Sequence, residues 1–163
     1  MLSKVLQNGF NDQIQKEFYS SYLYLAMAAH FESVNLPGFA SWMKKQADEE
    51  RSHGMRLWEH VCDRGGKVEL KAIEQPPAAF GKPLEVFQQV LQHEQKVTAS
   101  INALYALALK EGDVAAQVWL QWFVDEQVEE EKNASELIEQ LKMAGDQAFG
   151  TLFMDKHVLG QRK

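Results

Sequence analysis

Apolar residues recur at intervals of three and four along almost the whole chain of 163 residues, and the alternation typical of strands is absent. This spacing predicts four long helices, over residues 3–33, 37–64, 83–111 and 114–144. Turn-forming sequences separate them: Pro37-Gly38, Gly65-Gly66 and Gly112-Asp113. After Gly145, a shorter segment over residues 147–159 predicts a fifth helix, whose Leu152, Phe153 and Val158 need to be buried somewhere.

The connection over residues 66–82 has no helical periodicity and contains Pro76-Pro77 and Gly81. A connection of this length inside a compact domain needs a structural reason. Each of the four long helices is about 40 Å long at 1.5 Å per residue, and this segment can run the length of such a helix as a crossover. The order of short, long and short connections therefore predicts an all-α four-helix bundle with its crossover between the second and third helices, as a single domain over residues 1–163.

Composition narrows the class of protein further. Apolar residues make up 45% of the chain, which indicates a globular protein, and the net charge of −6 disfavours binding to nucleic acid. Cys62 is the single cysteine, so no internal disulfide forms and a reducing compartment is favoured. No apolar run approaches the roughly 20 residues of a membrane helix, and the N-terminal segment lacks a signal-peptide core. We expect a cytoplasmic protein that contacts neither membrane nor nucleic acid.

Six ligand-type side chains interrupt the otherwise apolar faces of the four helices: Glu17, Glu50, His53, Glu94, Gln127 and Glu130. They form two copies of one pattern, because the interval from Glu17 to Glu50-x-x-His53 equals the interval from Glu94 to Gln127-x-x-Glu130. The number of residues that separates Glu17 from Glu94, and Glu50 from Gln127, also separates Glu49 from Glu126. Each copy has a turn near its midpoint, so two antiparallel hairpins bring the six side chains to one level of a shared interior.

Buried carboxylates at one level predict a bound cation. An isolated buried carboxylate costs several kcal/mol, and several at one height repel each other. No inward Lys or Arg lies at this level on the predicted faces, so a multivalent cation is the simplest compensation. Oxygen ligands with one imidazole suit iron or manganese, whereas a structural zinc site more often uses cysteine. The number of ligands exceeds the need of one ion, which favours two ions bridged by a carboxylate.

Three residues at or near this level have more than one interpretation. Tyr24 lies two turns from Glu17 on the same face, and it hydrogen-bonds a site carboxylate, donates an electron, or is an ordinary core tyrosine. Trp122 is either a redox-active aromatic or a core residue. Gln127 is a poorer ligand than a carboxylate, and it binds metal or only hydrogen-bonds a carboxylate. The remaining histidines do not share a face with the six and are interpreted as ordinary: His30, His60, His93 and His157.

This constellation resembles the ferritin-like di-iron family, and it is similar to the bacterial non-haem ferritins in particular. The resemblance covers nearly the whole chain, and its most specific part is the string from Val124 to Glu131. Two departures distinguish the chain from haem-containing bacterioferritins. Their second E-x-x-H motif is replaced here by Gln127-x-x-Glu130, and Arg51 stands at the position of their haem-ligating methionine. We therefore expect iron and no haem.

The resemblance also implies roles for individual residues. The first iron is matched by Glu17, Glu50 and His53, and the second by Glu50 and Glu94. Gln127 and Glu130 match the positions beside the second iron, and Tyr24 matches a tyrosine near the centre. A third iron site in this family is matched by a set of carboxylates: Glu49, Glu126, Glu129 and Glu130.

The function that the resemblance implies is ferroxidase activity coupled to iron storage. Fe²⁺ is oxidised by O₂ or H₂O₂ at the two-iron centre, and Fe³⁺ is stored as a mineral inside a homo-oligomeric shell of 24 subunits. The fifth helix of such a shell lies at its four-fold contacts. Two alternatives remain open from the sequence: a di-iron oxidase or peroxide scavenger that stores no iron, and a structural bundle with a buried polar network.

Overall fold

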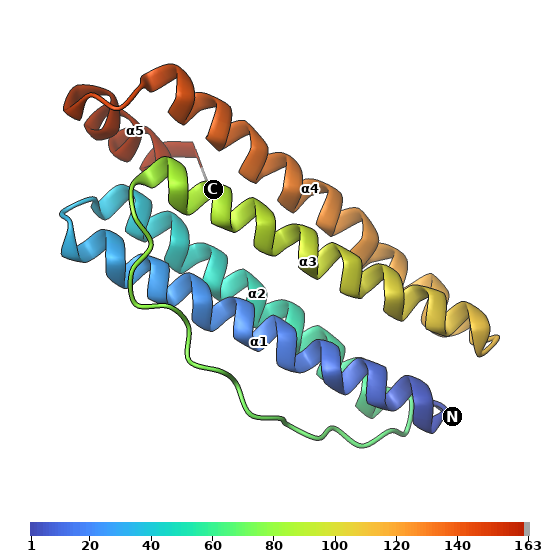
Figure 1. The fold of residues 1–163 in the computed structure, drawn as a ribbon. Coiled ribbons are helices and arrows are strands. Elements are labelled where there is room, and N and C mark those ends of the chain that lie inside the picture. Colours follow the sequence, from blue (N-terminus) through green and yellow to red (C-terminus); the bar gives the residue numbers. More distant parts are fainter. Residues whose placement is uncertain (162–163) are drawn as a thin grey trace.

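The structure is a computed structural model that describes residues 1–161, with side chains through residue 157. It contains five helices, α1 (Lys4–Ser33), α2 (Pro37–Asp63), α3 (Pro83–Lys110), α4 (Val114–Ala144) and α5 (Ala148–Gln161). Figure 1 shows α1 to α4 side by side in one bundle, with α5 folded across one end. The predicted all-α architecture is confirmed, and each predicted helix end lies within two residues of the observed one.

Local sequence signals explain where the helices begin and end. The Ser3 hydroxyl accepts a hydrogen bond from the backbone N–H of Leu6 at the start of α1, and the Asp113 carboxylate does the same for Ala116 at the start of α4. Proline occupies the first turn of α2 and of α3. At the end of α4, Gly145 has a φ of 71°, a left-handed conformation that favours glycine.

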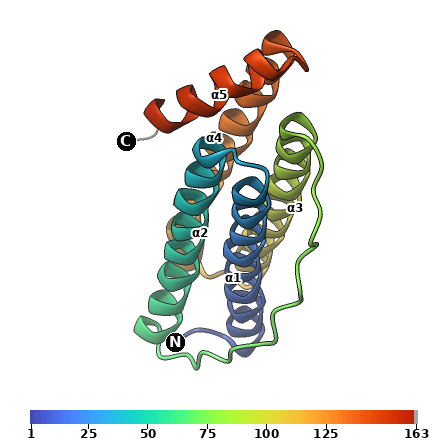
Figure 2. The same ribbon diagram turned by 90° about the vertical axis from the view of Figure 1, so that its left-hand side faces the viewer.

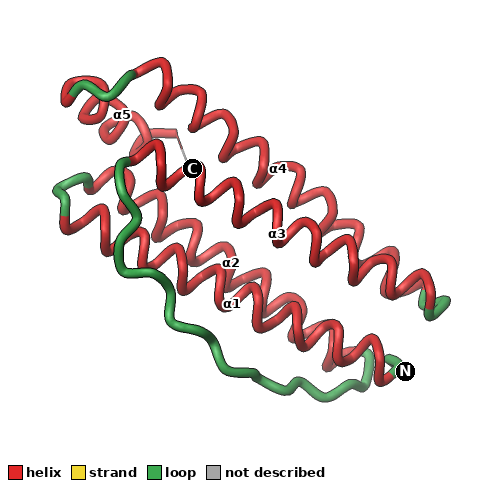
Figure 3. Tube along the Cα trace, in the orientation of Figure 1, coloured by secondary structure: helices red, strands yellow, loops and turns green. Residues whose placement is uncertain are grey.

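The bundle consists of two antiparallel hairpins joined by the predicted crossover. Helix α1 packs chiefly on α2, and α3 packs chiefly on α4. The segment over residues 64–82 runs along the outside of α1 from one end of the bundle to the other, as both ribbon views show (Figures 1 and 2). It is the longest loop of the described chain (Figure 3). Three polar side chains at four-residue intervals on α1 hydrogen-bond its backbone: Gln7, Asn11 and Gln15.

Two apolar clusters fill the bundle, and a polar layer separates them. On α1 one cluster ends at Ile14 and the other begins at Leu23, and on α3 the same boundary falls between Val90 and Val97. The gap on α2 lies between residues 47 and 57, and that on α4 between residues 123 and 134. These gaps contain all six predicted ligand-type residues. The two apolar clusters therefore hold the polar layer between them, about halfway along the bundle.

Helix α5 is attached to the bundle by a carboxylate that sequence patterns do not reveal. The α2 N-cap residue, Leu36, offers no side-chain hydrogen bond. Instead, Asp155 Oδ1 accepts hydrogen bonds from the backbone N–H groups of Gly38 at 2.8 Å and Phe39 at 3.0 Å. A Cβ on Gly38 would lie 1.7 Å from the Asp155 carbonyl oxygen. A residue of α5 therefore caps α2, and glycine permits the close approach.

Asp155→Ala is expected to release α5 from the end of α2. The substitution leaves two buried backbone N–H groups without their acceptor, which costs about 1–3 kcal/mol. We expect faster amide hydrogen exchange throughout α5 while exchange in α1 and α3 stays unchanged. Asp146→Ala is the matched control, because this exposed aspartate near the same end makes only a 3.7 Å contact with Lys82. Unchanged α5 exchange in Asp155→Ala would show that the cap does not hold the helix.

Three large apolar side chains of α5 remain exposed in the single chain, although Met154 of the same helix is buried in the core. Leu152 and Phe153 are 53% and 49% exposed, and Phe149 is 81% exposed. The side chain of Val158, the third residue predicted to need burial, lies outside the described residues. Among the described helices, none is both long and apolar enough to cross a bilayer.

Candidate metal centre

The polar layer brings the predicted ligand-type residues together in the interior. Each is at most 3% exposed, including Glu130 on α4: Glu17, Glu50, His53, Glu94, Gln127 and Glu130. Glu17, Glu50 and His53 each direct one potential ligand atom to positions within 4.8 Å of one another. His53 Nδ1 lies 3.6 Å from Glu50 Oε2. Two carboxylates and one imidazole of the first hairpin therefore converge on a space that suits a metal ion.

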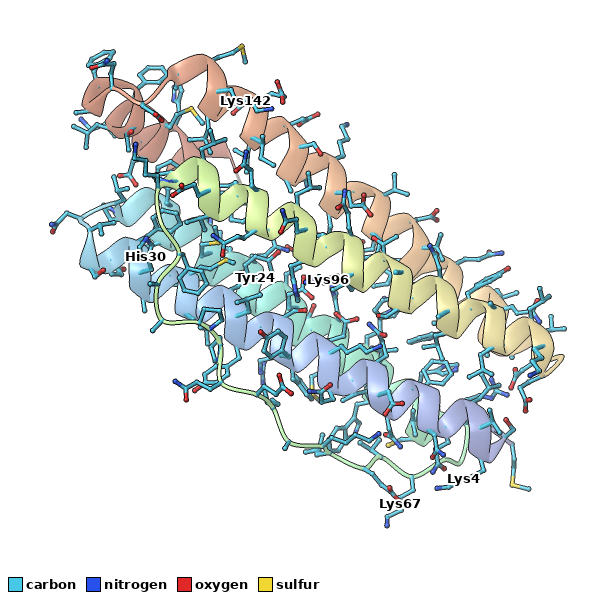
Figure 4. The ribbon with its side chains drawn as sticks, in the orientation of Figure 1. Lys4, Tyr24, His30, Lys67, Lys96 and Lys142 are labelled. Carbon is cyan, nitrogen blue, oxygen red and sulfur yellow. The ribbon has the colours of Figure 1, made fainter. Side chains whose placement is uncertain are left out.

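Glu94 contributes a carboxylate from the second hairpin, held by hydrogen bonds. The Tyr24 hydroxyl donates to Glu94 Oε1, and Tyr24 is fully buried between α1 and α3 about halfway along the bundle (Figure 4). Gln127 Nε2 donates to Glu94 Oε2 at 3.2 Å and to Thr98 Oγ1 at 3.3 Å. Of the interpretations offered for Tyr24 and Gln127, the geometry favours hydrogen bonding to a site carboxylate.

A second cluster adjoins the first on the α2–α4 side. Glu49, His53 and Glu126 have ligand atoms within 4.8 Å of one another, and the two glutamates are half-buried. The imidazole of His53 faces both clusters, because its Nε2 lies 4.0 Å from Glu126 Oε1. Glu129 is exposed and does not belong to either cluster in the described structure.

Burial makes the charged form of the central carboxylates unfavourable. Desolvation raises the pKa of Glu17 well above its usual value, and the neighbouring Glu50 carboxylate adds to this shift. Desolvation also raises the pKa of Glu50, with repulsion from Glu94 as the next cause, and it raises the pKa of Glu94. Glu17 Oε2 and Glu50 Oε2 are buried without a hydrogen-bond partner. These two bare oxygens beside His53 fit a site that a cation completes.

Aromatic side chains enclose the imidazole. The Trp122 ring lies edge-on to His53 with ring centroids 5.4 Å apart, and Phe123 lies at 5.9 Å. The Arg56 guanidinium carbon is 4.0 Å from the Trp122 ring centroid. Trp122 therefore contacts the centre directly, and its contacts limit rotation of the His53 ring.

Of the histidines interpreted as ordinary, His93 adjoins the centre, because its ring lies edge-on to that of Tyr24 with centroids 6.3 Å apart. Its Nε2 is 2.7 Å from Ser20 Oγ, and burial lowers its pKa to about 4, so it is neutral at pH 7. Sequence reasoning missed a different neighbour of the centre, Gln13, which is buried and hydrogen-bonds Glu17. One signal for it was present, because Gln13 precedes Glu17 by four residues as Gln46 precedes Glu50.

Comparison with known proteins places this bundle in a family. The ferritin family model, described as a ferritin-like domain, matches residues 7–144. The chain belongs to the ferritin family. This ferritin is 44% identical to the bacterial non-heme ferritin of Bacteroides fragilis (strain 638R) over 162 residues, covering 99% of this chain and 100% of the relative. It is 38% identical to that of Staphylococcus aureus (strain USA300), covering 99% and 97% of the two chains.

Solved structures confirm the ferritin fold. An open-pore ferritin from the archaeon Archaeoglobus fulgidus superposes with a TM-score of 0.97 at 41% identity, covering 99% of this chain and 100% of that one. Family membership and the buried Glu/His cluster together identify an iron-storage ferritin with ferroxidase activity. The two alternatives that the sequence left open, a non-storing oxidase and a structural bundle, are therefore not retained.

Proposed function

We propose that the polar layer is the ferroxidase centre, with two Fe²⁺ ions as its substrates. Glu17, Glu50 and His53 Nδ1 bind the first ion. Glu50 bridges to the second ion, which Glu94 and Glu130 also bind. The observation that carries this assignment is the pair of bare, buried oxygens on Glu17 and Glu50 beside the imidazole. Carboxylate and imidazole ligands suit Fe²⁺, and the cation offsets the repulsion between the buried carboxylates.

The reaction requires two electrons from two ions held close together. Each Fe²⁺ gives one electron, so two Fe²⁺, one O₂ and two protons yield two Fe³⁺ and one H₂O₂. A carboxylate shared by both ions keeps them at the separation of about 3.5–4 Å that suits paired-metal chemistry. Tyr24 and Gln127 hold the Glu94 carboxylate through hydrogen bonds, so both act here as positioning residues.

A third iron is proposed on the α2–α4 side, where the oxidised product leaves the centre. Glu49 and Glu126 are half-buried between the centre and the surface, and Glu129 and Glu130 follow Glu126 on α4. Partial burial is the main cause that raises the pKa of Glu126, while the neighbouring carboxylates of Glu49 and Glu129 raise it further. A cation at this position relieves that repulsion, so these carboxylates are suited to accept Fe³⁺.

Storage requires an enclosed volume, which a single bundle does not provide. We propose a homo-oligomeric shell of 24 subunits, in which contacts between copies cover the exposed apolar residues of α5. The mass of this shell is that of 24 chains of 18.6 kDa each. A reducing compartment suits the single Cys62, and we place the shell in the cytoplasm.

Two measurements test this function. Anaerobic titration with Fe²⁺ is expected to saturate at two to three ions per chain, and the double variant Glu49→Ala/Glu126→Ala is expected to lose the third ion and keep two. Native mass spectrometry is expected to find an assembly with the mass of 24 chains. Absence of saturable Fe²⁺ binding would reject the centre, whereas a monomer or dimer would reject the shell and leave the centre standing.

A further inference from the structure

Two buried glutamines hydrogen-bond the two carboxylates assigned to the first iron. Gln13 Nε2 donates to Glu17 Oε1 at 2.7 Å, and Gln46 Nε2 donates to Glu50 Oε1 at 3.5 Å. Gln13 is 1% exposed and Gln46 is fully buried. Each glutamine lies one helical turn before its glutamate, a spacing at which side chains on one face meet. The two pairs share this spacing, but only the Gln13–Glu17 bond is short, because the Gln46–Glu50 contact is at the outer limit of a hydrogen bond.

Each glutamine hydrogen-bonds one oxygen of its carboxylate and leaves the other oxygen without a partner. They occupy Oε1 of Glu17 and of Glu50, while Oε2 of each residue is buried without a partner. Glu50 Oε2 is also the oxygen that lies 3.6 Å from His53 Nδ1. The short bond from Gln13 therefore fixes the rotation of the Glu17 carboxylate and leaves Oε2 as the oxygen that can bind a metal ion.

A residue of α3 and the Glu17 carboxylate together orient the Gln13 amide. The one hydroxyl proton of Ser100 is shared between Gln13 Oε1 at 2.7 Å and the backbone oxygen of Val97 at 3.0 Å. With the amide oxygen engaged by Ser100, the amide nitrogen faces Glu17. The flipped amide would direct its oxygen at the Glu17 carboxylate, and the two acceptors would repel each other. Ser100, Gln13 and Glu17 therefore form one connected chain of hydrogen bonds from α3 to α1.

A neutral amide is well suited to this position. It stabilises a buried carboxylate by hydrogen bonding and adds no positive charge that would repel Fe²⁺. The doubled pattern of the sequence shows where such donors occur. Gln13 and Gln46 are separated by the same number of residues as Glu17 and Glu50. In the second copy of the pattern the equivalent positions are Val90 and Phe123, whose side chains have no hydrogen-bond donor. The second hairpin has no equivalent pair.

We propose that Gln13, held by Ser100, is a positioning residue that presents Glu17 Oε2 to the first metal ion. This inference rests on the proposed function of Glu17 and Glu50 as iron ligands. Hydrogen-bonding partners of metal ligands typically contribute about 10–100-fold to metal affinity because they hold the ligand in its binding orientation.

The test is anaerobic titration of the full-length protein with Co²⁺, whose visible spectrum reports on ligand number. Gln13→Met preserves side-chain volume and removes the donor, and we expect about 10-fold weaker Co²⁺ binding with an altered visible spectrum. Ser100→Ala should weaken binding in the same direction by less. Gln7→Met is the matched control, since Gln7 is a buried, hydrogen-bonded glutamine of α1 away from the centre. It should lower thermal stability and leave Co²⁺ affinity unchanged.

The outcomes separate this inference from the function it rests on. Wild-type Co²⁺ affinity and spectrum in both Gln13→Met and Ser100→Ala would overturn the positioning role. Should Gln13→Met fail to fold, Ser100→Ala decides alone, because it removes only one hydroxyl. An equal loss of affinity in Gln7→Met would also overturn the inference, since a general effect on the fold would then account for it. Failure of the wild type to bind Co²⁺ at the centre would instead reject the proposed function.

Discussion

Glu50→Ala is expected to slow Fe²⁺ oxidation by at least about 100-fold. The substitution removes the one carboxylate proposed to bind both ions, so neither the separation of the ions nor their charge balance is maintained. A bound metal ion contributes several kcal/mol to such reactions, and a change of about 1.4 kcal/mol in the barrier corresponds to a factor of ten in rate. Stopped-flow absorbance after mixing the protein with Fe²⁺ in aerated buffer measures the loss.

The control for this variant is an exposed glutamate of the same helix. Glu59→Ala makes the same change in helix propensity as Glu50→Ala but removes none of the proposed ligands. Its Fe²⁺ oxidation rate should therefore match that of the wild type. Both variants should retain the native mass and the helical circular dichroism of the wild type, because the hydrogen bond of Glu50 with Gln46 is long, at 3.5 Å. A Glu50→Ala protein that oxidises Fe²⁺ at the wild-type rate would refute the bridging assignment.

Glu17→Gln/Glu50→Gln is expected to make the metal-free protein more stable at pH 7. Burial raises the pKa of both carboxyls above their ordinary value of 4.5. Below that value both carboxyls are protonated in the folded and unfolded chains. As the pH rises above it, the unfolded chain releases these protons first, so the folded wild type loses stability progressively toward its raised pKa values. Glutamine does not titrate, and the double variant escapes this loss.

Differential scanning calorimetry of the metal-free proteins at pH 5 and pH 7 measures the effect. The variant should unfold at a higher temperature than the wild type at pH 7, and the difference should be smaller at pH 5. Redox-inert Zn²⁺ should reverse the order at pH 7 by stabilising only the wild type.

The control for this second variant is the exposed pair Glu32→Gln/Glu139→Gln, which removes two negative charges from the surface, each paired with a lysine, and should not raise the stability at pH 7. A double variant of the centre that is less stable than the metal-free wild type at pH 7 would show that the carboxylates stabilise the fold. That result would contradict our expectation that burial of the two carboxylates destabilises the metal-free protein.

Much of this architecture was predictable because it depends on local patterns. Helical periodicity indicated five helices, and Pro37, Gly112 and Gly145 marked their boundaries through backbone preferences that act within a few residues. The equal intervals in the two halves predicted one polar level, because residues equidistant from a hairpin turn lie at the same height. The assignment of individual ligands to individual ions stays a prediction.

Other features depend on contacts between segments distant in the sequence. Asp155 looks like an ordinary charged residue, and its role as the cap of α2 depends on Gly38, far away in the chain. The exact face that α3 turns inward is a second example. Val90 and Val97 are buried, whereas their neighbours Leu91 and Thr98 are only half-buried.

The sequence by itself determined the helices, their order, the level of the polar layer and the chemistry of its side chains. Only the tertiary structure decided which carboxylate oxygens are bare, that Gln127 directs its amide nitrogen at Glu94, and that Ser100 orients Gln13. The reason is one of scale. Periodicity defines the face and height of a residue to within a helical turn, whereas a hydrogen bond requires its two atoms to lie within a few tenths of an ångström of the correct distance.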